Sequence, residues 1–354
     1  MSEPVDRSRV RFLHLGQMIV DLTVYVLSLI HISHLGQMIV DLTVYVDRIP
    51  ERGGDVFADK ATMNAGGGYN VLWAVKQMGL SPDFFGAVGT GPMGDILRGA
   101  MRRIGVAAQG PTIAGLDTGY CVAMTEPDGE RSFISVSGAD AQMGPDEFAG
   151  LALRDDDLVY LCGYSFMSPG TRTAVERFAA ARTEWTQAGG RVLFDAGPMV
   201  AEFPGSSLQA MIDLHPMWSM NDLEGCLLAE RLGVAARGEQ ERCRLLSQRL
   251  GAPVILRVGS DGAWFADGDA ARKVPTPRVG AVDTNGAGDA HAGVLGAALL
   301  EGIPRDRALV LANCAGALST TRPGPATCPD RQAIEDAADK LVGSADSLVG
   351  STDS

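Results

Sequence analysis

The segment with the clearest chemical meaning is residues 283–289, Asp-Thr-Asn-Gly-Ala-Gly-Asp, which stands directly before an apolar, alanine-rich stretch that predicts a helix. The backbone amides of Gly286, Ala287 and Gly288 would therefore point at an anion, assisted by the helix dipole. Asp289 would lie in the first helical turn beside that anion, where its carboxylate could take a proton from a hydroxyl attacking a phosphoryl group. The combination indicates phosphoryl transfer rather than the plain alternative, a capped helix after a glycine turn.

A second glycine-rich segment, Gly-Gly-Gly-Tyr-Asn, lies far upstream at residues 66–70. Gly67 and Gly68 would let the backbone approach a polyol closely, and Asn70 offers both donors and acceptors to hydroxyl groups. Asp41 follows a predicted strand, and its acceptor-only carboxylate suits a diol. Taken alone, the glycines and Asn70 favour a flexible turn with Asn70 as the helix N-cap, and the alternative for Asp41 is a solvated strand end. The presence of the segment 283–289 in the same chain favours substrate binding.

Strand-like and helix-like segments that alternate along the chain must position these residues. Apolar strands are predicted at 34–40, 84–88, 157–162, 191–195 and 253–258. Helices are predicted near 70–78, 94–103, 169–188, 237–250, 287–300, 305–320 and 330–342. This alternation favours an α/β fold with a mainly parallel sheet flanked by helices. Residues 43–63 and 117–137 are β-rich without a helical period, which predicts a small separate sheet that would serve as a lid.

Together these segments resemble the ribokinase or PfkB family of carbohydrate kinases over about residues 34–340. The resemblance implies a ribokinase-like fold and an ATP-dependent kinase that transfers the γ-phosphate to a hydroxyl of a sugar or nucleoside. It also implies that Asp289 is the catalytic base and that the amides of the Gly-Ala-Gly segment form an anion hole. The implied substrate-binding residues are Asp41, Gly67, Gly68 and Asn70.

The same resemblance implies a nucleotide site that contains Mg²⁺. Asn221-Asp-Leu-Glu224 matches an NxxE pattern, so Glu224 would help place Mg²⁺ and its waters, although a capped helix with an acidic first turn gives the same pattern. The implied nucleotide-side residues are Asn221, Gly259, Gly262, Thr284 and Asn313. The resemblance also implies a possible site for a monovalent cation near the loop at residues 283–284, as many relatives have.

Two departures from the family pattern bear on the acceptor. Ile39 stands where sugar kinases often have Asn, and Asp195-Ala-Gly-Pro198 stands where several carry DxNxR. Both changes remove polar groups that could hold a sugar, which favours a more apolar acceptor such as a nucleoside. A non-catalytic, regulatory binding protein for sugars or nucleosides on the same fold is the alternative function, against which the intact Asp289 argues.

Gly89-Thr-Gly-Pro-Met-Gly94 fits the GxGxxG pattern of dinucleotide-binding units. Such a unit needs an acidic residue at the end of the next strand, and the residues before Asp117 make a poor strand. A dehydrogenase is therefore a weak alternative. The segment is more similar to the family's GxVGxDxxG, with Gly91 at the position where Asp is usual, a change expected to alter the substrate pocket.

Residues 14–26 are repeated identically at residues 34–46, with Leu-Ser-Leu-Ile-His-Ile-Ser between the copies. Two copies do not make a stacked repeat architecture. We interpret 1–33 as a duplicated or spurious segment outside the fold, 34–342 as the kinase domain, and the Ser/Gly/Asp-rich stretch 343–354 as a flexible tail.

The bulk composition narrows the possible partners. A formal net charge of −13 and no Lys/Arg cluster argue against nucleic-acid binding. The apolar run at residues 22–32 is too short to span a membrane. Six scattered cysteines without a CxxC pair indicate a reducing, cytoplasmic setting. The free edge of the predicted lid sheet makes a homodimer through the lid plausible.

Overall fold

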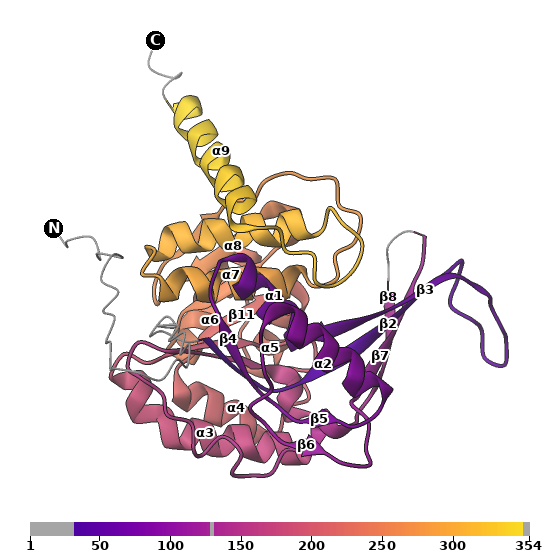
Figure 1. The fold of residues 1–354 in the computed structure, drawn as a ribbon. Coiled ribbons are helices and arrows are strands. Elements are labelled where there is room, and N and C mark those ends of the chain that lie inside the picture. The colour runs from indigo at the N-terminus through magenta and orange to yellow at the C-terminus, as the bar shows by residue number, and fades with distance from the viewer. Residues whose placement is uncertain (1–31, 128–130, 350–354) are drawn as a thin grey trace, which may run out of the picture.

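The computed structural model describes residues 32–127 and 131–349. They form an α/β body with a small β-sheet projecting from one side (Figure 1). The upstream copy of the repeated segment, residues 14–26, lies outside the described residues, as do 350–354. None of the described helices combines the length and the apolar character that a membrane crossing requires.

The body is built on an eight-stranded sheet in the order β14-β13-β12-β11-β10-β9-β1-β4. The strands are β1 (Ile32–Leu35), β4 (Pro82–Phe85), β9 (Leu158–Cys162), β10 (Arg191–Asp195), β11 (Met217–Asn221), β12 (Val254–Arg257), β13 (Ala263–Ala266) and β14 (Ala271–Val274). All neighbours from β4 to β12 pair in parallel, and β13 and β14 add an antiparallel edge. The predicted mainly parallel sheet is confirmed.

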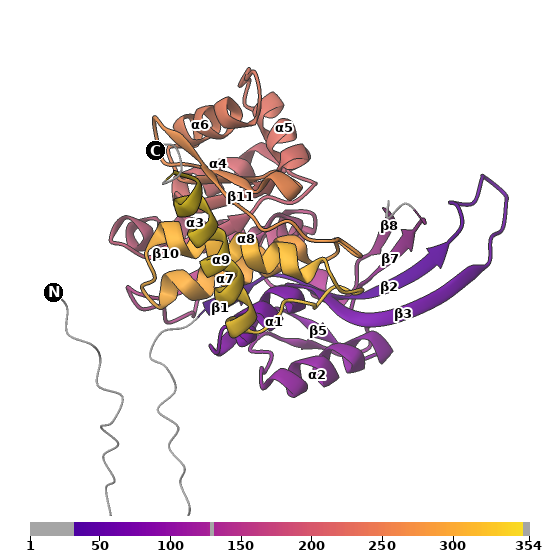
Figure 2. The ribbon, with the colours of Figure 1, turned by 90° about the horizontal axis from the view of Figure 1, so that it is seen from above.

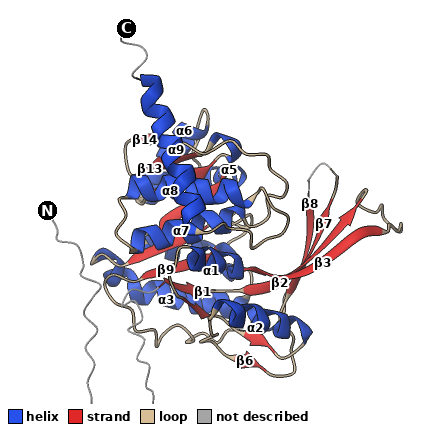
Figure 3. Ribbon diagram, turned by 45° about the horizontal axis from the view of Figure 1, so that its top comes forward, coloured by secondary structure: helices blue, strands red, loops and turns tan. Residues whose placement is uncertain are grey.

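Helices cover both faces of this sheet (Figure 3). One layer contains α1 (Gly68–Gln77), α7 (Ala287–Leu300), α8 (Arg305–Ser319) and α9 (Arg331–Val349). The other contains α3 (Pro169–Gln187), α4 (Gly205–Leu214), α5 (Asp222–Arg231) and α6 (Glu239–Leu250). Strand β9 shows why both layers form, because Leu158 and Tyr160 pack into one apolar cluster while Val159 and Leu161 pack into the cluster on the opposite face.

The projecting sheet has the order β3-β2-β7-β8 and is hereafter called the lid. Its strands are β2 (Met38–Val46), β3 (Ala58–Gly67), β7 (Tyr120–Thr125) and β8 (Arg131–Val136). Seen from above, β2 and β3 curve away from the helices as a long ribbon (Figure 2). At its base the lid packs against α1 and α2 (Pro92–Ile104), next to the short pair β5 (Val88–Gly89) and β6 (Thr112–Ile113). The predicted separate sheet is therefore present.

Several boundaries differ from the prediction. The strand expected at 34–40 is two strands, because Gly36, with φ of 150°, breaks the chain between Leu35 and Met38. Strand β1 begins at Ile32, so the last two residues of the segment assigned outside the fold belong to the main sheet. Ile32 is buried and pairs with both β4 and β9. At the other end, α9 continues through Val349, well into the stretch expected to be a flexible tail.

Candidate active site

Two cavities adjoin the N-terminus of α7. The first, the lid cavity, has a volume of about 420 Å³ and lies beneath the lid. It collects Asp289 and the four residues predicted to bind substrate, Asp41, Gly67, Gly68 and Asn70. The second, the α8 cavity, has a volume of about 370 Å³. It collects the five residues predicted on the nucleotide side, Asn221, Gly259, Gly262, Thr284 and Asn313, together with Ala287 and Gly288.

Asp289 lies in the first turn of α7 and reaches the lid cavity, while the neighbouring Gly288 lines the α8 cavity. Its Oδ2 accepts a hydrogen bond of 2.8 Å from Nδ2 of Asn70. Desolvation raises the pKa of Asp289 to about 6, and the Asn70 hydrogen bond opposes this shift. The carboxyl group is therefore a stronger base than an ordinary aspartate and is still mostly ionised at pH 7.

Gly286 caps α7 in a left-handed conformation with φ of 77°. A Cβ atom at this position would lie 2.0 Å from the carbonyl oxygen of Pro325, so both the backbone conformation and the neighbouring chain require glycine. Asp283 fixes the preceding loop, because its Oδ1 accepts from the amide of Asn285 at 2.8 Å and its Oδ2 accepts from the amide of Gly324 at 2.9 Å. The helix start is thus held from both sides.

Asp41 is in the middle of β2, opposite Asn64 of β3, rather than at the end of a strand as predicted. Burial raises its pKa to about 7, and the negative charge of Asp289 contributes to the shift. A Cβ atom on Gly66 would lie 2.1 Å from Oδ2 of Asp41, so the glycine makes room for this carboxyl group. With Asp140, whose pKa burial also raises, three such carboxyl groups therefore line the same cavity.

Asn221 and Glu224 form a capping box at the start of α5. Oδ1 of Asn221 accepts from the amide of Glu224 at 2.9 Å, and Oε2 of Glu224 accepts from the amide of Asn221 at 2.8 Å. Burial, followed by the charge of Asp195, raises the pKa of Glu224 to about 7. The NxxE segment thus forms a helix cap, and Asn221 also lines the α8 cavity.

Asn313 has a structural contact in addition to its place in the cavity wall. Its Nδ2 donates to the carbonyl oxygens of Val274 at 3.1 Å and Pro275 at 3.0 Å. These bonds hold the end of β14 against α8 and so shape the cavity that Asn313 lines.

Arg257 is the residue of this region that the sequence analysis missed. It is the last residue of β12 and lines the α8 cavity. Its Nη2 lies 3.0 Å from Oδ2 of Asp195 and 3.7 Å from Oε2 of Glu224. Its position at the end of an apolar strand could have drawn attention to it, because arginine is rarely buried without a charged partner.

The GxGxxG segment has a structural explanation. Oδ1 and Oδ2 of Asp117 accept from the amides of Gly94 at 2.9 Å and Met93 at 3.0 Å, capping α2 from another part of the chain. A Cβ atom on Gly91 would lie 2.3 Å from Cγ of Asp117. Gly91 thus makes room for this cap, and it is not among the described residues that line the lid cavity.

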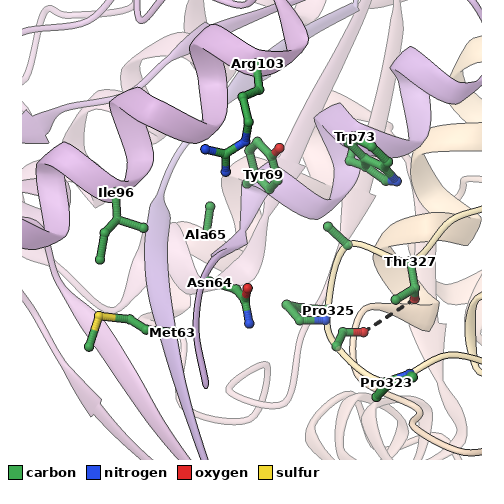
Figure 4. Close-up of a pocket in the computed structure, with 12 residues that line it drawn as sticks. Met63, Asn64, Ala65, Tyr69, Trp73, Ile96, Arg103, Pro323, Pro325 and Thr327 are labelled. Atoms are coloured by element: carbon green, nitrogen blue, oxygen red, sulfur yellow. Dashed lines mark hydrogen bonds between the residues drawn. The ribbon is translucent and has the colours of Figure 1, made fainter. Parts of the chain in front are cut away.

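A third hollow, of about 280 Å³, is lined by β3, α1, α2 and residues 323–327 (Figure 4). Tyr69, Trp73 and Arg103 are among its lining residues, and Asp289 is not. The loop 323–327 also supplies the amide of Gly324 to Asp283. The loop that lines this hollow therefore also supports the start of α7, but the hollow itself does not contain the site residues.

Solved structures similar to this chain share its architecture. Ribokinase from Giardia lamblia superposes with a TM-score of 0.76 at 22% identity, covering 87% of this chain and 99% of that chain. A nucleoside kinase from Burkholderia thailandensis, solved in complex with inosine, superposes with a TM-score of 0.73 at 20% identity, covering 88% and 97%. These likenesses define the fold as that of the ribokinases.

Sequence comparison identifies the family. The pfkB family carbohydrate kinase model matches residues 30–332. The uncharacterized sugar kinase YegV of Escherichia coli (strain K12) is 30% identical over 293 residues, covering 81% of this chain and 87% of that protein. The ATP-dependent ribose-1-phosphate kinase of Halopiger xanaduensis is 30% identical over 292 residues, covering 82% and 91%. The chain belongs to the pfkB family of carbohydrate kinases and is a phosphotransferase with an alcohol group as acceptor.

Proposed function

We propose that the protein transfers the γ-phosphoryl group of ATP to a hydroxyl of an unphosphorylated sugar or nucleoside. Asp289 is the general base, and the amides of Gly286, Ala287 and Gly288 form the anion hole. The observation that carries the proposal is that Asp289 lines the lid cavity while Ala287 and Gly288 line the α8 cavity. The base thus faces the acceptor at the point where the phosphoryl donor would meet the helix start.

In this mechanism Asp41 and Asn70 position the acceptor in the lid cavity. One oxygen of Asp289 accepts from Asn70, so the other takes the proton of the acceptor hydroxyl. The amides at the start of α7 then stabilise the charge that develops on the transferred oxygens. The lid excludes water, which would otherwise compete as the phosphoryl acceptor.

The lid cavity supports an uncharged acceptor. Its charged lining residues are Asp41, Asp140 and Asp289, and none of its described lining residues is Lys or Arg. A sugar phosphate, such as the substrate named for the Halopiger relative, would meet only negative charge there. Ile39 and Met199 line the cavity among its apolar residues, which supports a nucleoside over a free sugar.

Mg²⁺ would neutralise the nucleotide phosphates. The described residues contain no group of three or more His, Cys, Asp or Glu side chains that could hold a metal ion by themselves. That composition fits Mg²⁺, which usually keeps several waters and takes only one or two carboxylates together with substrate phosphates. Glu224 would contribute through water, because its Oε2 is already bonded to the amide of Asn221. A monovalent cation near the loop 283–284 is also proposed.

The proposed homodimer would form through the open face of the lid. Met63 and Ile134 are large apolar residues exposed on its outer strands, and the cross-strand register places both on one face, in a row with Leu42 and Val122. An exposed apolar sheet surface of this kind is typical of an interaction site. Sedimentation measurements on native protein and on Ile134→Lys would test it, with a monomeric native protein contradicting the dimer.

An acceptor panel tests the proposed function. ADP release would be measured with MgATP and ribose, fructose, 2-keto-3-deoxygluconate, ribose 1-phosphate, adenosine, inosine, guanosine and pseudouridine. We expect turnover with an uncharged member and none with ribose 1-phosphate. Tight binding of one compound without turnover would instead support the non-catalytic binding protein, and turnover of ribose 1-phosphate alone would contradict the uncharged acceptor.

A further inference from the structure

Arg257 is the sole Lys or Arg among the described residues lining the lid and α8 cavities. The surroundings are strongly acidic, because Asp195, Glu224 and Asp289 are all close enough to influence its ionisation. A polyanionic nucleotide entering such a site needs local positive charge. The side chain of Arg257, which is only 14% exposed, is therefore the natural source of that charge.

The hydrogen bonding of Arg257 is incomplete. Nη2 is directed at Asp195 and Glu224, but Nε and Nη1 are buried and have no hydrogen-bond partner among the described residues. A buried donor left unsatisfied costs about 1–3 kcal/mol, and more when it is charged. A buried donor of this kind calls for an explanation, and a catalytic role is one of those known for such groups.

The unpaired side of the guanidinium faces the proposed anion hole. A Cβ atom at Gly288 would lie 2.6 Å from Nη1 of Arg257, so the guanidinium packs directly against the second glycine of the Gly-Ala-Gly segment. Glycine at position 288 consequently makes room for Arg257 as well as for an approaching phosphate. The cation and the backbone amides are thus placed at one point of the site.

We infer that Arg257 binds the phosphoryl group during its transfer, with Asp195 and Glu224 holding the guanidinium in place. The inference rests on the proposed kinase function. A planar guanidinium suits the oxygens of a transferring phosphoryl group, and it remains charged throughout. Catalytic hydrogen bonds often become short and aligned only when the reactants are bound, so Nε and Nη1 acquire their acceptors in the nucleotide complex.

The two carboxylates keep Arg257 in its charged form. Burial alone would lower the pKa of the guanidinium, but the negative charges of Asp195 and Glu224 outweigh burial and raise it. Both carboxylates also limit the movement of the side chain. This arrangement gives a fixed cation at the anion hole, which costs little reorganisation when charge develops during the reaction.

The test compares two variants that remove the same ion pair from opposite ends. Arg257→Met removes the positive charge and keeps an unbranched chain, while Asp195→Asn breaks the pair and leaves the guanidinium. Calorimetry would measure the binding of ADP and of adenylyl imidodiphosphate, which carries a γ-phosphoryl group, both with Mg²⁺. Thermal unfolding and kcat would be measured on the same samples.

We expect Arg257→Met to weaken adenylyl imidodiphosphate binding about tenfold or more, the loss typical of a charged hydrogen bond, with ADP binding nearly unchanged. Its kcat would fall about 10²-fold or more, as on removal of one donor to a developing oxyanion. Asp195→Asn would keep the preference for the γ-phosphoryl compound. If Arg257→Met does not fold, Arg257→Lys is titrated in its place and should retain part of the same preference.

The inference would be overturned if both variants lost affinity for ADP and for adenylyl imidodiphosphate to the same extent and their melting temperatures fell equally. Arg257 would then have a purely structural role. The inference would also be overturned if the native protein is active and Arg257→Met has the same nucleotide affinities and the same kcat. That result would leave the proposed kinase function in place. The two claims can also separate in the opposite way. If Arg257→Met selectively loses adenylyl imidodiphosphate binding but the native protein turns over no acceptor, the role of Arg257 in phosphoryl binding would be supported and the proposed kinase function would be contradicted.

Discussion

Nδ2 of Asn70 donates a hydrogen bond of 2.8 Å to Oδ2 of Asp289, although 219 residues separate the two along the chain. The bond joins the first turns of α1 and α7, which pack side by side on one face of the main sheet. Asn70 was predicted to contact the substrate, and the structure places it in the same cavity. It also orients the carboxylate that we propose as the base, so its removal should affect chemistry more than binding.

Asn70→Ala should lower kcat by about 10- to 100-fold, because a misplaced base loses much of the advantage of its orientation. The KM for the acceptor should rise less. Steady-state kinetics with the acceptor identified from the panel would measure both constants.

Gln332→Ala is the matched control, since Gln332 is exposed on α9 and its Nε2 donates to Oδ1 of Asp336 at 2.8 Å, an amide-to-carboxylate bond away from both cavities. Its kinetics should stay close to native. A loss confined to KM in Asn70→Ala would show that Asn70 contacts the acceptor without positioning Asp289.

The dependence of kcat/KM on pH, which reports the ionisation of the free enzyme, should have an acid limb near pH 6. Asp289 must be ionised to accept a proton, and its pKa is raised to about 6, so activity is lost as pH falls through that value. Asn70→Ala should move the limb to higher pH, because it removes a hydrogen bond that lowers the pKa of Asp289. Asp195→Asn should move it to lower pH, because it removes a negative charge that raises the same pKa. Shifts in one common direction would contradict this assignment.

Asp140 connects the base of the lid to the body. Its Oδ1 accepts from the amides of Gly119 at 2.6 Å and Gly138 at 3.1 Å, and its Oδ2 accepts from Nε2 of Gln37 at 3.2 Å. These donors lie on three of the chain segments that enter or leave the lid. Asp140→Ala should lower the melting temperature and raise the acceptor KM while ADP affinity is kept, since an unsatisfied buried donor costs about 1–3 kcal/mol.

Asp146→Ala serves as the control for that variant, because Asp146 forms a solvent-exposed ion pair with Arg177. Exposed pairs contribute little to stability, so the melting temperature should barely change. Unchanged acceptor kinetics in Asp140→Ala would argue against a role for Asp140 in placing the lid.

Asp41→Asn should stabilise the folded protein, and more so at pH 8 than at pH 5. Because the folded-state pKa of Asp41 is raised to about 7, its ionisation opposes folding increasingly as pH rises toward that value. Thermal unfolding of native and variant protein across this range measures the difference. A stabilisation that is largest at pH 5 would have the wrong sign and would contradict the raised pKa.

Local sequence predicted the parts of the fold that have a strong period. Residues 287–300 were predicted as a helix and form α7 with the same bounds, because the segment is apolar all round and follows a glycine turn. Short elements such as α4, α5, β11, β13 and β14 were missed, because each is only 4 to 10 residues long and lacks a distinctive pattern. Ile32 was misassigned because only its pairing with β4 and β9 makes it part of the sheet.

In the candidate site, too, residues with a local sequence signal were predictable and residues that depend on long-range contacts were not. Residues inside glycine-rich segments, such as Gly286 and Asn70, could be selected because glycine and a polar neighbour mark a turn locally. The contacts of Arg257 with Asp195 and Glu224 could not be predicted, since they depend on the parallel order of β10, β11 and β12. The cap that Asp117 supplies to α2 was likewise hidden, because donor and acceptor lie 23 and 24 residues apart.

The most direct test of the central claim is ADP release by Asp289→Asn with MgATP and the best acceptor from the panel. The account predicts that kcat falls about 10²- to 10⁴-fold, the usual contribution of a general base, while calorimetry still finds near-native affinity for acceptor and ADP. Turnover close to that of the native protein would contradict the assignment of Asp289 as the base.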